Sequence, residues 1–205
     1  MQVRNQQIQS FSNFSEDILQ KILGFLSMDE AVTLITDAIK ASESKLLSAL
    51  LRCSPYNIGL LPNVTLHQIM LLAVKKGNLD IMKELLGNGC QFSMITLFHA
   101  ARIGNLSAMM WLKENGCRWS LNTFGAAAEH GNLENIMWLK ENGCPWNEET
   151  FEAAVRHGNL KNMMWLKENG CPWNEDTFAA AARHGNLENM MWLKENGCPW
   201  NEDTF

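Results

Sequence analysis

The sequence has no excess of basic residues, no long apolar run and no apolar leader at its start. Its 205 residues include 17 lysines and arginines against 22 aspartates and glutamates, a net charge of -5. Nucleic acid is therefore not an expected partner, because phosphate binding requires clustered positive charge. No run approaches the length of a membrane span, and residues 1–10 lack the apolar core of a signal peptide. We expect a cytoplasmic protein, with the nucleus as an alternative, and no contact with a membrane.

The sequence also lacks the residue patterns of an enzyme or a cofactor site. It contains no nucleophile elbow, phosphate-binding glycine-rich loop, HExxH motif or paired-carboxylate arrangement. Its six cysteines include no tight C-x2-C pair, the spacing that zinc sites usually use. We therefore predict no catalytic residue, no cofactor, no metal site and no enzymatic activity.

What the sequence does contain is a repeat. The strings NGC and GNL each recur five times at intervals of 27 residues. A fixed period in this range indicates an array of stacked units that share one core. Such an array exposes a long surface of equivalent positions, which favours a binding protein over an enzyme. The cysteines of the five NGC strings are Cys90, Cys117, Cys144, Cys171 and Cys198.

One repeat, Pro145–Cys171, predicts two short helices joined by a tight turn. The first begins after Asn147, a good N-terminal cap, and carries an apolar stripe of Phe151, Ala154 and Val155. The second begins after Asn159 and carries Leu160, Met163, Met164, Trp165 and Leu166. Each helix is too short to be stable alone, so neighbouring repeats must supply the core.

Tryptophan, cysteine and histidine recur in register, and we interpret all three as structural. The tryptophan ladders are expected to pack between repeats, although exposed tryptophans would instead form a binding surface. Cysteine is a small buried residue here, since equivalent positions about 10 Å apart cannot form a disulfide. The histidines precede a glycine at each first-helix end, where a cation suits the helix dipole, and we prefer this to a metal-binding ladder. The residues are Trp138, Trp165, Trp192, then Trp119, Trp146, Trp173, Trp200, and His130, His157, His184.

The segment GNLENMMWLKENGCPWN (Gly185–Asn201) resembles, without gaps, the second-helix segment of ankyrin repeats, G-H-L-E-I-V-K-L-L-L-E-N-G-A-D-V-N. TFEAAVRHG (Thr150–Gly158) is similar to the first-helix pattern P-L-H-x-A-A-x-x-G. In this alignment the buried apolar places fall on Leu187, Met190 and Leu193. The resemblance implies an all-α, ankyrin-type solenoid over residues 63–205, with about five repeats and the start of a sixth.

Two departures from the ankyrin pattern change the expected surface. The histidine at the start of the first helix is replaced by Phe98, Gly125, Glu152 and Ala179. The period is 27 rather than about 33 residues, and the shortening falls in the loop where ankyrins project a β-hairpin finger. The finger loops should thus be truncated to Cys-Pro-Trp-Asn. Arrays of this kind resemble those of giant viruses of amoebae and some protists, which would place the protein in a host cytoplasm.

Comparison of the repeats with one another identifies two variable columns in the first helix. They run Leu71, Phe98, Gly125, Glu152, Ala179 and Lys75, Arg102, Glu129, Arg156, Arg183. In ankyrin-like arrays the first helices line the concave face, so these columns are candidates for contact with a partner protein. Drift at solvated positions explains the same variation equally well. The partner-binding candidates are Phe98, Arg102, Glu129, Glu152, Arg156 and Arg183.

The N-terminal part has two interpretations. Residues 1–13 are expected to be flexible, and residues 14–62 to be helical. The run Phe14–Leu34 resembles the first part of an F-box, which docks on the Skp1 adaptor of a cullin ubiquitin ligase, but its later Val-Cys…Trp part has no counterpart. The alternative is a capping helix and a worn first repeat that shield the end of the array. The F-box interpretation assigns Skp1 contact to Ile18, Leu19, Ile22, Leu23 and Leu26.

The sequence therefore supports a protein–protein interaction module without catalysis, or a substrate receptor of a Skp1–cullin ubiquitin ligase. The chain stops at Phe205, just inside the first helix of a sixth repeat, without a polar capping repeat. We expect from this that it is truncated at its C-terminus.

Overall fold

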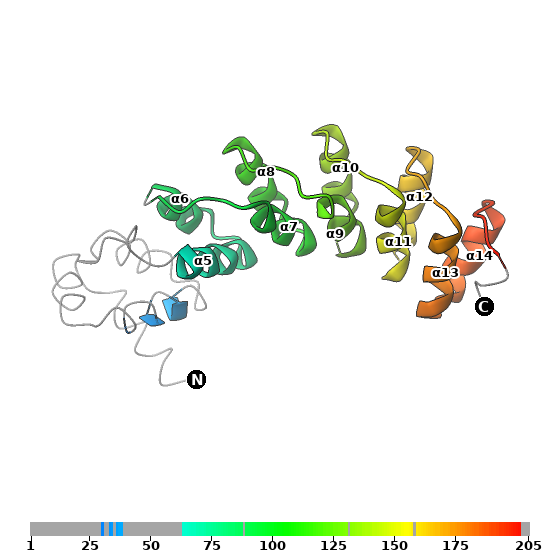
Figure 1. Ribbon diagram of the computed structural model, residues 1–205, viewed down its shortest axis with the longest axis horizontal. Coiled ribbons are helices and arrows are strands. Elements are labelled where there is room, and N and C mark those ends of the chain that lie inside the picture. Colours follow the sequence, from blue (N-terminus) through cyan, green and yellow to red (C-terminus); the bar gives the residue numbers. More distant parts are fainter. Residues whose placement is uncertain are drawn as a thin grey trace. The chain divides into compact units, whose positions relative to one another are not determined.

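The computed structural model describes residues 30, 33, 34, 36–38 and 63–201 of the protein, apart from residues 88, 131 and 158. Within them the regular elements are helices, and no strand occurs (Figure 1). None of these described helices is long and apolar enough to cross a membrane. The helices are α5 (Asn63–Lys76), α6 (Leu79–Gly87), α7 (Met94–Arg102), α8 (Leu106–Glu114), α9 (Thr123–His130), α10 (Leu133–Glu141), α11 (Glu148–Arg156), α12 (Leu160–Glu168), α13 (Glu175–His184) and α14 (Leu187–Glu195).

The chain divides into two compact units, Met1–Thr96 and Leu97–Phe205. The first contains α5 and α6, which pack against each other, and the second contains most of α7 and every later helix. The domain boundary expected after residue 62 stays a prediction, because most of residues 1–62 lie outside the described residues. The same is true of the Skp1-binding candidates Ile18, Leu19, Ile22, Leu23 and Leu26.

In the second unit the helices form two rows (Figure 1). The first helices of successive repeats pack side by side, with α11 between α9 and α13, and the second helices follow the same rule, with α10 against α12. The two helices of one repeat also pack together, as α11 does with α12. This arrangement is the all-α solenoid of helix-turn-helix repeats that the period of 27 residues predicts.

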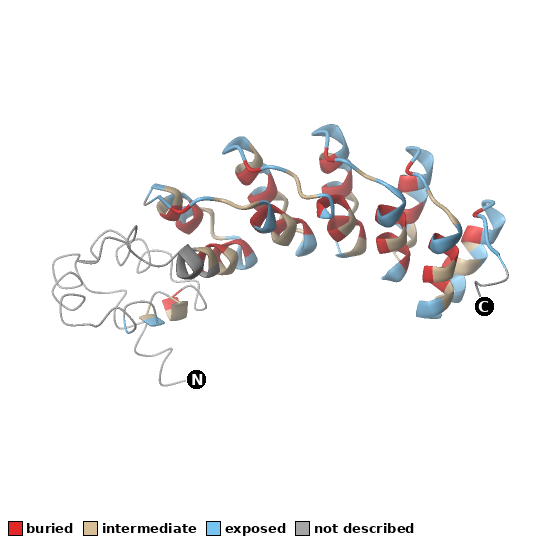
Figure 2. Cartoon of the chain, viewed as in Figure 1, coloured by how far each residue is buried: buried red, intermediate tan, exposed pale blue. Residues whose placement is uncertain are grey.

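The core lies between the two rows (Figure 2). Phe151, Ala154 and Val155 are fully buried, as the apolar stripe of the first helix predicts. The second helix contributes Met163 and Leu166 in the same repeat. The prediction of burial was wrong for Leu187, whose side chain is 67% exposed, while Met190 is half-buried and Leu193 is fully buried. No described helix packs beyond α14, which adds to the exposure of Leu187.

The NGC string ends each second helix with a hydrogen-bonded cap. Gly170 adopts a left-handed backbone (φ 78), which glycine tolerates without a steric cost. The turn brings the N–H of Cys171 to the carbonyl of Leu166 at 2.9 Å, the long bond of a Schellman motif. The Asn169 side-chain amide donates to the Trp165 carbonyl at 2.8 Å. All three letters of the string thus serve to terminate the helix.

Asparagine also caps the N-terminus of several helices. Asn147 occupies the N-cap of α11 as predicted. One repeat later, Asn174 accepts a hydrogen bond from the Thr177 N–H at 3.2 Å, and its own N–H donates to the Thr177 hydroxyl at 3.2 Å. This reciprocal pair satisfies two backbone donors at the start of α13.

A buried asparagine near the start of the later second helices links successive repeats. Asn162 donates from its side-chain amide to the Ala128 carbonyl at 3.3 Å, and Asn189 donates to the Val155 carbonyl at 3.1 Å. Both carbonyls belong to the last turn of a first helix, where the regular i+4 backbone donor is missing. Each of these second helices therefore caps the first helix of the repeat before it. This role was not predicted, because the ankyrin pattern has isoleucine where this protein has Asn162 and Asn189.

The tryptophans pack between repeats, as predicted, but they are not fully buried. Trp146 lies edge-to-face with Trp165 of its own repeat, with ring centroids 6.2 Å apart, and its ring centroid lies 5.2 Å from that of Phe124 in the preceding repeat. The Lys140 ammonium lies 3.3 Å from the Trp146 centroid. The same contacts recur at Trp173, which meets Trp192 and the Lys167 ammonium. Trp146 and Trp173 are half-buried.

Candidate functional site

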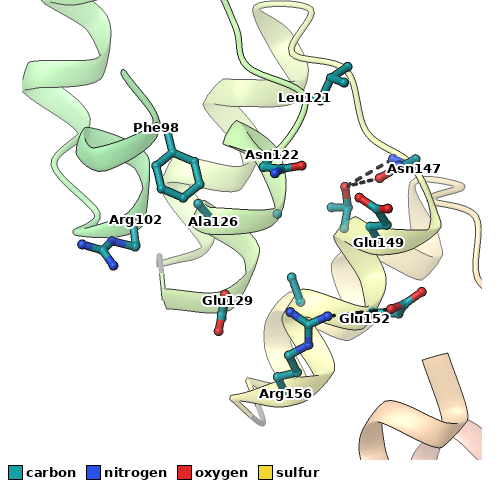
Figure 3. Close-up of a pocket in the computed structure, with 13 residues that line it drawn as sticks. Phe98, Arg102, Leu121, Asn122, Ala126, Glu129, Asn147, Glu149, Glu152 and Arg156 are labelled. Carbon is teal, nitrogen blue, oxygen red and sulfur yellow. Dashed lines mark hydrogen bonds and ion pairs between the residues drawn. The ribbon is translucent and has the colours of Figure 1, made fainter. Parts of the chain in front are cut away.

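The second unit carries a groove of about 320 Å³ on its first helices (Figure 3). We call it the first-helix groove. Its walls come from α7, α9 and α11 and from the loops that precede α9 and α11. It is lined by Phe98, Arg102, Leu121, Asn122, Gly125, Ala126, Glu129, Asn147, Glu149, Thr150, Glu152, Ala153 and Arg156.

The two variable columns meet in this groove because of helical geometry. Their members are four residues apart in each first helix, so they project from the same face of the helix. Gly125 lines the groove without a side chain, close to α11. A Cβ atom at Gly125 would lie 3.6 Å from the Ala153 Cβ, an ordinary contact, so a longer side chain there would extend into the groove.

The groove contains charge of both signs. Arg156 Nη2 lies 3.8 Å from Glu152 Oε2, as Figure 3 shows, and Arg102 Nη2 lies 3.3 Å from His99 Nδ1. The pKa of Glu152 is raised, first because its carboxyl is partly buried and then because Asp176 and Glu149 are close, while Arg156 opposes the shift. The carboxylate of Glu152 is therefore only partly compensated within the protein.

Five of the six predicted partner-binding residues line this one groove: Phe98, Arg102, Glu129, Glu152 and Arg156. The sixth, Arg183, lies exposed in α13 and does not line it, although its charge lowers the pKa of Glu152. That any of them contacts a partner stays a prediction.

Several residues of the groove were not predicted as partner contacts, among them Leu121 and Asn147 in the loops and Glu149 in the first turn of α11. Asn147 and Glu149 resemble their counterparts in the next repeat, Asn174 and Asp176, although the preceding repeat has Ser120 and Asn122 at these positions. Leu121 did carry a signal. Its side chain is 85% exposed, and the following repeats have glutamate at its position, Glu148 and Glu175.

The repeat cysteines are buried free thiols, which confirms their interpretation as small packed residues. Burial raises the pKa of the Cys144 and Cys171 thiols to about 12 and that of Cys198 to about 11. Cys171 Sγ donates to the Asn147 carbonyl at the start of its own repeat at 3.6 Å, and Cys198 Sγ does the same to Asn174. A reactive cysteine requires a lowered pKa and access, and these thiols have neither.

These thiols predict a loss of stability at alkaline pH. Because their folded pKa lies above the ordinary value of 9.0, the stabilisation is complete below pH 9 and is lost as the pH rises towards 12. The urea midpoint of the native protein should therefore fall more steeply above pH 9 than that of a Cys144→Ala/Cys171→Ala variant. Parallel pH profiles of the two proteins would contradict the assignment.

Comparison with known proteins adds the fold and nothing further. No family model matches the sequence, and no curated protein matches it. Among solved structures, the ankyrin repeat domain of human ASB11 has a TM-score of 0.63 at 21% identity, over 80% of this chain and 84% of that chain. The fold is an ankyrin-type solenoid. In the described part of this solenoid the loops between repeats contain no strand, as the truncated finger loops predict.

Proposed function

We propose that the protein is a non-catalytic interaction module that binds a segment of another protein in the first-helix groove. The observation that carries the proposal is that five of the six candidates line one groove, together with the exposed apolar side chain of Leu121. Stacking of the first helices brings these equivalent positions side by side, so their variation between repeats gives the groove its particular chemistry. The ankyrin-type fold supports the same conclusion, because solenoids use extended surfaces of equivalent positions for binding.

The charges of the groove indicate the chemistry of the bound segment. The carboxylates of Glu129, Glu149 and Glu152 outnumber the guanidinium groups of Arg102 and Arg156. Partial burial and neighbouring carboxylates already disfavour the charged form of Glu152. A lysine or arginine of the partner would relieve this and form a charge-assisted hydrogen bond. The half-buried ring of Phe98 and the exposed Leu121 would contact the apolar part of that side chain.

Affinity capture with matched variants tests this proposal. Native full-length protein should retain a partner from cells that produce it, and Glu152→Lys should reduce the retained amount by at least about tenfold, because charge repulsion replaces attraction. Gly125→Leu should have a similar effect by filling the groove. Glu168→Lys makes the same charge change on exposed α12 and should retain the partner.

The variants separate a site in the groove from binding elsewhere. Circular dichroism checks that each variant is folded. Equal retention by Glu152→Lys, Gly125→Leu and the native protein would contradict the proposal. So would equal loss in Glu168→Lys, because it would indicate a response to net charge alone.

A second function, a substrate receptor of a Skp1–cullin ubiquitin ligase, has the resemblance of Phe14–Leu34 to an F-box in its favour. It requires Ile18, Leu19, Ile22, Leu23 and Leu26 to contact Skp1. Full-length protein should then bind purified Skp1, and an Ile22→Glu/Leu26→Glu variant should not. Absence of binding at micromolar concentration would exclude this function and would leave the groove proposal intact. Localisation in the cytoplasm, of an infected host if the chain is viral, suits either function.

A further inference from the structure

Three ligand-type side chains converge where α9 and α11 end. Glu129 Oε1 lies 3.4 Å from His157 Nδ1 and 3.8 Å from His130 Nε2. The two imidazole rings meet edge-to-face, with centroids 4.4 Å apart. One nitrogen or oxygen from each of the three residues lies within 4.8 Å of the other two. Two helix ends from adjacent repeats thus supply two imidazoles and a carboxylate to one point.

We propose that Glu129, His130 and His157 form a binding site for a divalent transition metal ion, with zinc as the preferred ion. Zinc binds imidazole nitrogen and carboxylate oxygen at about 2.0–2.2 Å in tetrahedral geometry, which places two ligand atoms roughly 3.4 Å apart. The distances from the Glu129 oxygen to the two histidines are close to this value. Small rotations of the partly exposed side chains would complete the approach. Three protein ligands leave a fourth position for water.

The position of the cluster in the fold favours a cation. α9 ends at His130, and α11 ends at Arg156 directly before His157, so the negative ends of two helix dipoles lie at the site. Imidazole is neutral over much of the physiological range and then offers a nitrogen lone pair to a metal. The basic neighbour Arg156 is paired with Glu152.

The next repeat provides an internal comparison that lacks the site. His157 and His184 repeat the histidine pair, but Arg156 and Arg183 occupy the position of Glu129. The ring nitrogen Nδ1 of His184 lies 2.9 Å from the Ala180 carbonyl oxygen of its own helix. Glu129 is the one acidic member of its column, so the sequence forms the full set once. This inference replaces the sequence-based expectation of no metal site. It does not depend on the proposed partner, although Glu129 also lines the first-helix groove.

Calorimetric titration of zinc chloride into metal-free, full-length protein tests the site. The native protein should bind one zinc ion at the site formed by Glu129, His130 and His157. His157→Ala should weaken this binding by about 100-fold or more, at least as much as the loss of an outer partner of a metal ligand costs. His130→Ala and Glu129→Arg should do the same, the latter by restoring the residue of the neighbouring repeats. His184→Ala is the matched control and should bind zinc like the native protein.

Thermal unfolding gives an independent measurement. Zinc should raise the melting temperature of the native protein and of His184→Ala, because a ligand that binds only the folded state stabilises it, and it should not raise that of His157→Ala. Circular dichroism without metal checks that each variant is folded. No zinc binding by the native protein would overturn the proposal. Equal binding by the native protein and all three cluster variants, or equal loss in His184→Ala, would also overturn it.

Discussion

Phe151→Ala should lower the free energy of unfolding by about 3–5 kcal/mol, the usual cost of removing a buried phenylalanine ring. Phe151 is fully buried in α11, and its ring lies 5.2 Å from that of Trp173. Helix α11 packs between α9 and α13, so the cavity left by the ring cannot collapse easily. Urea unfolding followed by circular dichroism measures the loss.

The control for Phe151→Ala is Met164→Ala in the next helix of the same repeat. The Met164 side chain is 42% exposed, so its truncation should cost less than about 1 kcal/mol. If both variants lost the same stability, or if Phe151→Ala lost less than about 1 kcal/mol, the core assigned to the first helices would be wrong.

Trp146→Ala should cost about 2–3 kcal/mol. The estimate combines the burial of roughly half of an indole surface with the loss of its aromatic partners. Those partners are Phe124 and Trp165, and the Lys140 ammonium covers the ring. Truncation removes contacts to two repeats at once, so the interface between them should weaken. The same urea experiment applies.

The control for Trp146→Ala is Trp200→Ala. Trp200 holds the equivalent position two repeats later, where no later described repeat covers it. Trp200 is 55% exposed, and its ring centroid lies 6.5 Å from that of Phe178. Its truncation should cost less than about 1 kcal/mol. Equal losses in Trp146→Ala and Trp200→Ala would indicate that the tryptophan ladder does not hold the repeats together.

Much of the fold follows from the sequence, because the repeat amplifies each local signal. An asparagine before an apolar stripe is a weak indication of a helix start on its own, but Asn147 and Asn174 recur in register and cap α11 and α13. The NGC strings likewise mark the ends of second helices. A signal repeated at a fixed interval is difficult to produce by chance, so the period predicts the solenoid.

Contacts between repeats were harder to predict, since they depend on how helix ends meet. His130, His157 and His184 are equivalent in the sequence, and only the structure brings Glu129 to two of them. The hydrogen bond from Asn162 to the Ala128 carbonyl joins residues 34 positions apart, and no local pattern signals it. The first-helix groove was predicted only in part. Five of its helix residues were predicted from their variation between repeats, whereas the loop residue Asn147 was predicted only as a helix cap.

We expect the first helices, rather than the second helices, to bind the partner protein. Amide hydrogen exchange of the full-length protein, with and without the captured partner, tests it most directly. We expect added protection in α9, α11 and the loops that contain Leu121 and Asn147, because these elements line the groove. Protection in α10 and α12 should change little. Protection confined to α10, α12 and the tryptophans beside them would contradict the account.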